Sequence, residues 1–192
     1  MIRVAITGNI ASGKSVVQNI LEKQGFKVLD TDKVGHEVLN CDEIKTTFSG
    51  FDVFSDDGNI SREKLGKLIF EHSELKRKLE DISHPKIADK ILEFFAENKD
   101  ERVLFVGIPL VFEAGMENLF DKIVLIYTDD EVRKLRLMTT RGYSEAYADV
   151  RMGCQLSQNK KSERADYVIF NNKSIKDLEI EVYKFLKSFY AN

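Results

Sequence analysis

The sequence predicts an α/β fold: a doubly wound, mostly parallel five-stranded sheet with a phosphate loop, a helical substrate insert and a helical lid. Two observations lead to this prediction. Short apolar runs alternate with helical patterns along the 192 residues, as expected for parallel strands covered on both faces. A glycine-rich motif also joins the first apolar run to the first helical pattern, which is the arrangement of a phosphate-binding site.

The runs that we expect to form strands are rich in Val, Ile and Phe. They are Ile2–Ile6, Phe26–Leu29, Val103–Ile108, Lys122–Tyr127 and Tyr167–Phe170. Two four-residue patterns, Thr128–Glu131 and Ser174–Asp177, resemble capping boxes and predict that helices begin there. The alternation of strands with helices favours a parallel sheet over an antiparallel one.

The motif itself is Gly8–Ser15, which fits G-x-x-x-x-G-K-[ST] between a strand and an amphipathic helix. Gly8 and Gly13 permit a tight loop whose backbone N–H groups point at anionic oxygens, and the N-terminus of the helix adds a positive field. Lys14 can reach the β- and γ-phosphates, and the Ser15 hydroxyl can ligate Mg²⁺. The motif therefore predicts a nucleoside triphosphate site.

About 70 residues separate the second and third strands, where one helix would need about a dozen. Within this insert Ser61 is expected to cap a helix, Ser55–Asn59 to form a turn, and Pro85 to begin a further helix. Ligands of open parallel sheets bind beyond the C-terminal ends of the strands, where the insert starts. We therefore favour a substrate-binding insert over extra scaffold.

The segment from Asp129 to Ala165 is rich in arginine and lysine and is expected to contain two short helices. Its stretch Ser157–Arg164 is entirely polar. Such a run is usually a solvated face. In a phosphoryl-transfer enzyme it also suits a mobile lid whose arginines close over the phosphates. The residues alone leave both interpretations open.

Carboxylates follow the second strand, at the edge of the sheet that holds the phosphate loop. Asp32 can accept a proton from an attacking hydroxyl, or hold Mg²⁺ through water, together with Asp30. Alternatively, Asp32 only caps a helix that begins at Lys33. Near the end of the third strand, Gly107 occupies a position where many phosphate-loop proteins carry an aspartate that orients Mg²⁺, so Glu113 is a further candidate.

Composition restricts the partners. The net charge is −3 and the pI about 5.7, so there is no overall basic surface for nucleic acid. The longest apolar run, Val103–Phe112, is too short to span a bilayer. Cys41 and Cys154 lack metal-ligand spacing and are expected to be reduced thiols. These features predict a cytoplasmic protein without membrane or nucleic-acid partners, and leave its oligomeric state open.

The chain resembles the dephospho-coenzyme A kinase family along nearly its whole length. The matching stretches are Thr7–Ser15, Asp30–Asp32, Asp57–Arg62, His84–Pro85, Ile108–Glu113, Gln155, Ala165–Ile169 and Asn171. The resemblance implies transfer of the γ-phosphate of ATP to the ribose 3′-hydroxyl of dephospho-coenzyme A, with Mg²⁺. It also implies a nucleotide-binding core (1–32, 99–128 and 166–192), a coenzyme-binding insert (33–98) and a lid (129–165).

The resemblance assigns roles residue by residue. ATP would be bound by Gly8, Ala11, Ser12, Gly13, Lys14, Ser15, Val16 and Asn171. Dephospho-coenzyme A would be bound by Asp32, Arg62, His84, Pro109 and Leu110. The catalytic residues would be Lys14, Asp32, Arg136 and Arg141, and the metal-binding residues Ser15 and Asp32.

The chain departs from the family pattern at three places. Asn9 and Ala11 replace two loop glycines, and Gly107 replaces an aspartate. Arg141 is shifted by one place in the lid pattern, which leaves open whether Arg141 or Arg136 clamps the phosphates. Two alternatives to this function remain from the residues: another phosphate-loop kinase, such as a nucleoside monophosphate kinase, or a nucleotide-dependent switch with negligible turnover.

Overall fold

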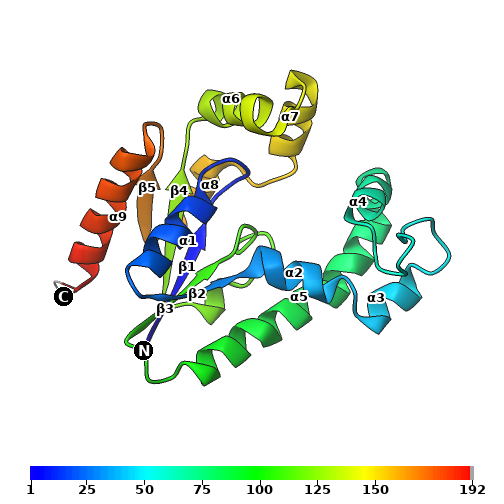
Figure 1. The fold of residues 1–192 in the computed structure, drawn as a ribbon, viewed down its shortest axis with the longest axis horizontal. Helices are drawn as coiled ribbons and strands as arrows, with labels where there is room; N and C mark the ends of the chain where they lie inside the picture. Colours follow the sequence, from blue (N-terminus) through cyan, green and yellow to red (C-terminus); the bar gives the residue numbers. More distant parts are fainter. Residues whose placement is uncertain (191–192) are drawn as a thin grey trace. The chain divides into compact units, whose positions relative to one another are not determined.

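The computed structural model describes residues 1–190, and its centre is a five-stranded sheet (Figure 1). The strands are β1 (Ile2–Thr7), β2 (Lys27–Asp30), β3 (Val103–Gly107), β4 (Lys122–Tyr127) and β5 (Tyr167–Phe170). All neighbouring strands are parallel, in the order β2-β3-β1-β4-β5. The predicted doubly wound α/β fold is confirmed.

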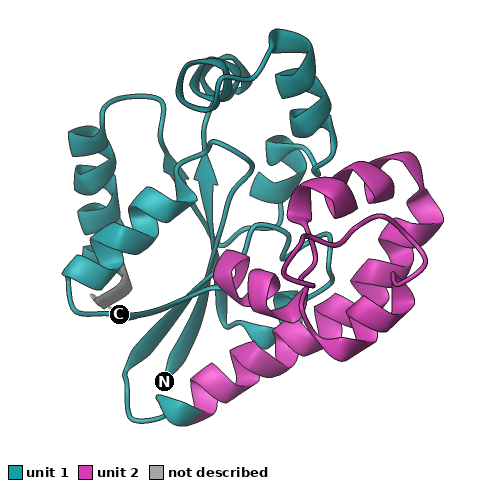
Figure 2. Cartoon of the chain, turned by 45° about the vertical axis from the view of Figure 1, so that its right-hand side comes forward, with its two compact units in different colours: residues 1–30, 97–192 teal, residues 31–96 magenta. Residues whose placement is uncertain are grey.

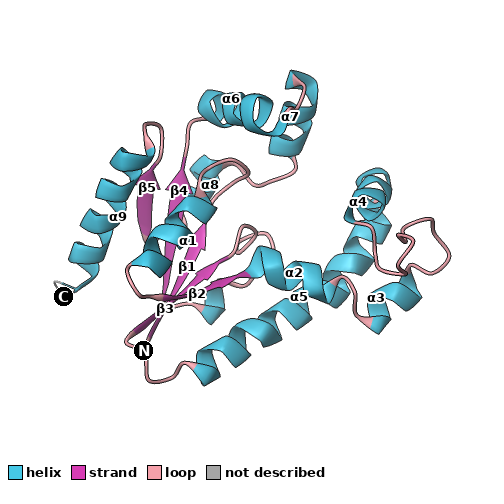
Figure 3. Ribbon diagram, viewed as in Figure 1, coloured by secondary structure: helices cyan, strands magenta, loops and turns pink. Residues whose placement is uncertain are grey.

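Helices connect the strands (Figure 3). They are α1 (Lys14–Lys23), α2 (Thr31–Val38), α3 (Asp42–Thr47), α4 (Arg62–Glu71), α5 (Ser73–Glu97), α6 (Asp130–Arg141), α7 (Glu145–Gly153), α8 (Gln158–Ser162), α9 (Ile175–Tyr190) and a short 3₁₀ helix, η1 (Glu117–Leu119). The hydrophobic core lies where α1 and α9 pack on one face of the sheet. Its members include Val4, Ile6, Val17, Leu21, Phe105, Val124, Ile169, Leu178 and Val182.

The chain divides into two compact units, coloured separately in Figure 2. The first consists of Met1–Asp30 and the chain from Glu97 onward, and it contains the sheet and residues 129–165. The second, Thr31–Ala96, is helical and has its own buried side chains, among them Ile44, Phe48, Leu65 and Ile91. The insert between β2 and β3 therefore has a core of its own.

The predicted helix beginning at Pro85 is wrong. Pro85 lies inside the single 25-residue helix α5. Proline removes one backbone donor and crowds the preceding turn, so it normally ends or kinks a helix. Here the apolar side chains on both sides of it, Leu79 and Ile91, are buried, so packing on both sides of the proline favours one continuous helix. The predicted cap at Ser61 is confirmed, since its side chain accepts from the Lys64 N–H.

Of the two capping boxes predicted in the sheet-containing unit, one is confirmed and the other is wrong. The capping box at Ser174 is confirmed, because Ser174 and Asp177 each accept a bond from the other's backbone N–H. The capping box at Thr128 is wrong: Asp129 occupies the cap position, and the Thr128 hydroxyl bonds elsewhere. Residues 129–165 form three helices, where two were predicted.

Candidate active site: a phosphate loop held by buried polar groups

The loop between β1 and α1 has the backbone of a phosphate cradle. Gly13 has φ +96° and Ala11 has φ +62°, a left-handed conformation that costs little for glycine but strains alanine. Within the described residues, the backbone N–H groups of Ala11, Gly13 and Ser15 donate to no protein acceptor. Together with the start of α1, these donors fit the oxygens of a bound phosphate.

Lys14 begins α1 and is buried. Its Nζ donates to Gln18 Oε1 at 3.2 Å and lies 3.7 Å from Asp30 Oδ1, at the end of β2. The Ser15 side chain is exposed at the mouth of the loop, and Val16 N–H donates to Gly13 O. The predicted nucleotide-site residues thus lie in the loop after β1 and in the first turn of α1. They are Gly8, Ala11, Ser12, Gly13, Lys14, Ser15 and Val16.

Asn171, just after β5, fixes the loop from the side. Its Nδ2 donates to Ser12 O at 2.7 Å, and the Thr128 hydroxyl donates to the same carbonyl at 3.0 Å. The amide of Asn171 also fills the space where a side chain at Gly13 would project, so glycine is required there for packing as well as for its φ angle. The predicted nucleotide-site residue Asn171 therefore contacts the loop through hydrogen bonds and packing.

Two arginines of α6 bond to loop carbonyls. Arg133 Nη1 donates to Ile10 O and Arg136 Nη1 to Ala11 O, both at 3.3 Å. Arg136 Nη2 also donates to Asn171 O at 2.9 Å, and burial lowers its pKa. Arg141, at the end of the same helix, is exposed, and its side chain has no hydrogen bond or ion pair to the phosphate loop among the described residues. Of the two predicted clamping arginines, the structure brings only Arg136 to the loop.

The segment between α7 and α8 holds the other side of the loop. Gln155 Oε1 accepts from Ile10 N–H at 2.8 Å, and the buried Asn9 donates through Nδ2 to Leu156 O at 2.9 Å. Leu156 N–H in turn donates to Glu113 Oε1 at 3.0 Å. Asn9 replaces a glycine of the family pattern, and its side chain adds a tether that glycine cannot make.

An ion pair between a buried lysine and a solvent-accessible glutamate supports this tether. Lys161 on α8 has a fully buried side chain whose Nζ lies 2.8 Å from Glu113 Oε1 and donates to Pro109 O at 3.0 Å. Burial lowers the pKa of Lys161, and the bond to Glu113 opposes this shift. Pro109 O also accepts from Thr7 Oγ1 at 3.2 Å. The interpretation of Ser157–Arg164 as a solvated face is therefore wrong for Lys161 and for the buried Gln158.

Sequence reasoning missed Gln18, Arg133 and Lys161. Each lies in a polar or amphipathic stretch where the residue type alone gives no sign of burial. For Gln18, its spacing of four residues from Lys14 was the only available signal, since such pairs face each other on a helix. Burial of Arg133 and Lys161 depends on contacts with residues more than 40 positions away.

Asp32 belongs to the first turn of α2, which begins at Thr31, so it does not cap a helix that opens at Lys33. It follows the end of β2 by two residues and is exposed. No group of three or more His, Cys, Asp or Glu side chains poised for a metal occurs in the described part of the chain.

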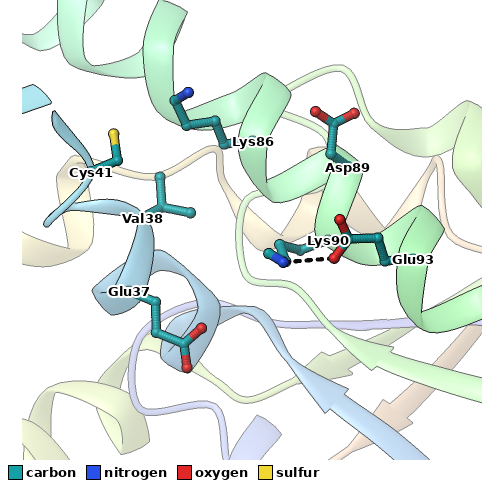
Figure 4. Close-up of a pocket in the computed structure, with 7 residues that line it drawn as sticks. All are labelled: Glu37, Val38, Cys41, Lys86, Asp89, Lys90 and Glu93. Carbon is teal, nitrogen blue, oxygen red and sulfur yellow. Dashed lines mark hydrogen bonds and ion pairs between the residues drawn. The ribbon is translucent and has the colours of Figure 1, made fainter. Parts of the chain in front are cut away.

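The other residues predicted to bind the substrate divide between the units. Pro109 and Leu110 are half-buried after β3, whereas Arg62 begins α4 and His84 lies inside α5. The helical unit also has a pocket of about 320 Å³, lined by Glu37, Val38, Cys41, Lys86, Asp89, Lys90 and Glu93 (Figure 4). Lys90 bonds to Glu93 and Lys86 to Glu43, so we assign this pocket no ligand.

No helix within residues 1–190 is both long and apolar enough to cross a membrane. Among solved structures, the chain resembles a dephospho-CoA kinase from Campylobacter jejuni (34% identity, TM-score 0.74, covering 97% of this chain and 96% of that one). It also resembles TT1252 from Thermus thermophilus (31% identity, TM-score 0.85, 99% and 96%). A shikimate kinase from Bacteroides thetaiotaomicron (15% identity, TM-score 0.57, 98% of each chain) shares the fold alone.

The sequence comparisons agree with the geometry. A dephospho-CoA kinase from Listeria innocua is 34% identical, and the match covers 98% of both chains. The corresponding kinase from Helicobacter pylori strain 26695 is 36% identical over 96% of both. The family profile described as dephospho-CoA kinase matches residues 2–177. These matches show that the chain belongs to the dephospho-CoA kinase family.

Proposed function

We propose that this chain transfers the γ-phosphate of ATP to the ribose 3′-hydroxyl of dephospho-coenzyme A, giving coenzyme A and ADP. The observation that supports it most is family membership across nearly the whole chain, combined with a phosphate loop in which the N–H groups of Ala11, Gly13 and Ser15 donate to no acceptor among the described residues. As the last step of coenzyme A synthesis, the reaction also fits a protein that works in the cytoplasm.

Within this reaction, the loop binds the phosphates of ATP and Lys14 carries positive charge to the transferred group. Phosphoryl transfer has a loose transition state, so positioning and charge neutralisation supply most of the catalysis. The Ser15 hydroxyl would hold Mg²⁺, which would supply positive charge to the phosphates of ATP. Asp32 orients the 3′-hydroxyl and accepts its proton, or contributes to metal binding through water.

The helical insert 33–98 supplies the coenzyme site in this proposal, with Arg62 and His84 among its contacts. Pro109 and Leu110, after β3, add contacts from the sheet-containing unit. Residues 129–165 act as a lid whose Arg136 and Arg141 neutralise the phosphates on closure. The observed bonds of Arg136 to the loop support a role beside the nucleotide.

The test is an acceptor panel. The purified protein is given ATP and Mg²⁺ with dephospho-coenzyme A, AMP, shikimate or no acceptor, and ADP release and product mass are measured. The proposal predicts ADP release only with dephospho-coenzyme A, together with a product heavier by one phosphoryl group. Equal or faster release with AMP would instead support a nucleoside monophosphate kinase. ATP binding without turnover on any acceptor would support a switch.

A further inference from the structure

The C-terminal end of β3 lacks a side chain at a position next to the phosphate loop. Gly107 pairs in register with Asp30 of β2 on one side and with Ile6 of β1 on the other. The loop begins immediately after β1. A carboxylate commonly occupies such a strand end in phosphate-loop proteins. The question is therefore what fills the space at Gly107.

Gln18 fills it. A Cβ placed on Gly107 would overlap the Gln18 amide, with Cδ at 2.5 Å and Oε1 at 3.0 Å. Separations under 3.0 Å are essentially never seen for real Cβ atoms, so a side chain at 107 requires Gln18 to move. Gln18 is only 4% exposed on the inner face of α1, which leaves little room for such a shift. The two positions therefore form a matched pair.

The same amide contacts the key cation of the loop. Gln18 Oε1 accepts from Lys14 Nζ at 3.2 Å, and Asp30 Oδ1 lies 3.7 Å from that nitrogen. The neighbours of the ammonium group thus include a neutral acceptor, Gln18 Oε1, and the Asp30 carboxylate. A second carboxylate in place of the amide would neutralise more of its charge in a buried site, where electrostatic interactions are strong.

We propose that Gln18 is a positioning residue for Lys14: its amide occupies the space left by Gly107 and directs the Lys14 ammonium without neutralising it. The positive charge of Lys14 then remains available to the phosphates of ATP. The simpler competing role is that Gln18 only fills space beneath the loop. Both roles predict steric coupling to position 107, but only the first predicts an effect of the amide oxygen on nucleotide binding.

The steric part is tested by melting temperatures of Gly107→Ala, Gln18→Ala and the double variant, which need no substrate. Gly107→Ala is expected to lower the melting temperature in the presence of Gln18, because the new methyl group overlaps the amide. In the Gln18→Ala background the same substitution should cost much less. An equal cost in both backgrounds would overturn the matched pair.

The positioning part is tested with Gln18→Met, which keeps the length of the side chain but removes the acceptor. Its affinity for ATP, measured by calorimetry without acceptor, should fall about tenfold, because Lys14 is then no longer held in position for the phosphates before ATP binds. The control is Gln24→Met at the C-terminal end of the same helix, which loses a bond to Tyr183 and should bind ATP normally. Unchanged ATP affinity in Gln18→Met would reduce Gln18 to a space-filling role.

Turnover on dephospho-coenzyme A gives a further readout, and the use of this readout rests on the proposed function. It should fall in Gln18→Met at least as much as ATP affinity does. If the wild-type protein binds ATP but transfers no phosphate to dephospho-coenzyme A, the proposed function fails while the calorimetric comparison still decides the role of Gln18.

Discussion

Residues 129–165 and the helical insert are both rich in charged residues, but the charged side chains lie in different environments. In the segment, the charged groups of Arg133 and Lys161 are buried and bond to the backbone of the phosphate loop or to the chain after β3. In the insert, ion pairs such as Lys67–Glu63 lie in solvent. Exposed pairs contribute little to stability, whereas a buried charge must be fully paired.

The difference shows how a site can be preorganised by charged residues far from it in sequence. Buried donors have few acceptors within reach. Arg133 therefore holds a carbonyl of the phosphate loop, and Lys161 holds the carbonyl of Pro109 after β3. An exposed ion pair of the insert, such as Lys67–Glu63, competes with water and joins only two side chains of one helix. The experiments below break or sharpen this contrast, beginning with the largest expected effect.

Lys14→Ala should reduce phosphate transfer by about a thousandfold, because the variant loses the cation of the loop that faces the transferred group. The fold should survive, since alanine is favourable in α1. Steady-state ADP release and circular dichroism measure the two effects. Near-normal ADP release by a folded variant would contradict the role of Lys14.

Lys161→Met should cost about 3 kcal/mol of stability, because it removes the bonds of the buried Nζ to the Glu113 carboxylate and to Pro109 O. This corresponds to a melting temperature lower by about 6–12 °C. The matched control is Lys67→Met, which removes an exposed ion pair from the insert and should leave the melting temperature nearly unchanged. Equal losses in the two variants would show that the contrast between the regions has no energetic consequence.

Asp32→Asn should slow transfer by at least about a hundredfold while ATP and dephospho-coenzyme A still bind. The substitution keeps the size of the side chain and removes its charge. Rapid-quench measurements of a single turnover isolate the transfer step. Unchanged turnover together with an unchanged melting temperature would exclude a role for Asp32 as the base or as an essential structural residue.

Arg136→Ala and Arg141→Ala should each lower the single-turnover transfer rate by about tenfold if residues 129–165 close as a lid. Arg136→Ala should also lower the melting temperature, because Arg136 bonds to Ala11 O and Asn171 O before any ligand arrives. Arg141→Ala should not, since its side chain is exposed. A normal rate in both variants would mean that the segment contains no clamp.

Much of the fold follows from local patterns. The five strands are apolar runs, of which β1, β3 and β4 are largely buried, and the phosphate loop is predicted by the short-range spacing of its motif. Helix α5 could not be predicted as one element, because tertiary packing around Pro85 overrides its local preference. The Thr128 hydroxyl likewise bonds to Ser12 O and Asn171 O, distant acceptors that no local pattern indicates.

The site was predictable where one motif contains both the chemistry and the geometry, as in Gly8–Ser15. It was not predictable where a polar side chain is buried by residues far along the chain, as Lys161 is by Glu113. A lysine in a polar run is nearly always solvated, so sequence favours the wrong interpretation there. Gln18 and Gly107 illustrate the same limit, because their relation exists only in three dimensions.

Hydrogen exchange with each substrate added alone tests the division of work between the two regions most directly. Dephospho-coenzyme A alone should protect backbone amides of the insert, residues 33–98, whereas ATP alone should protect the loop around Gly13 and residues 129–165. This account predicts two separate sets of protected amides. Protection by dephospho-coenzyme A confined to the loop around Gly13, with the insert unchanged, would contradict it.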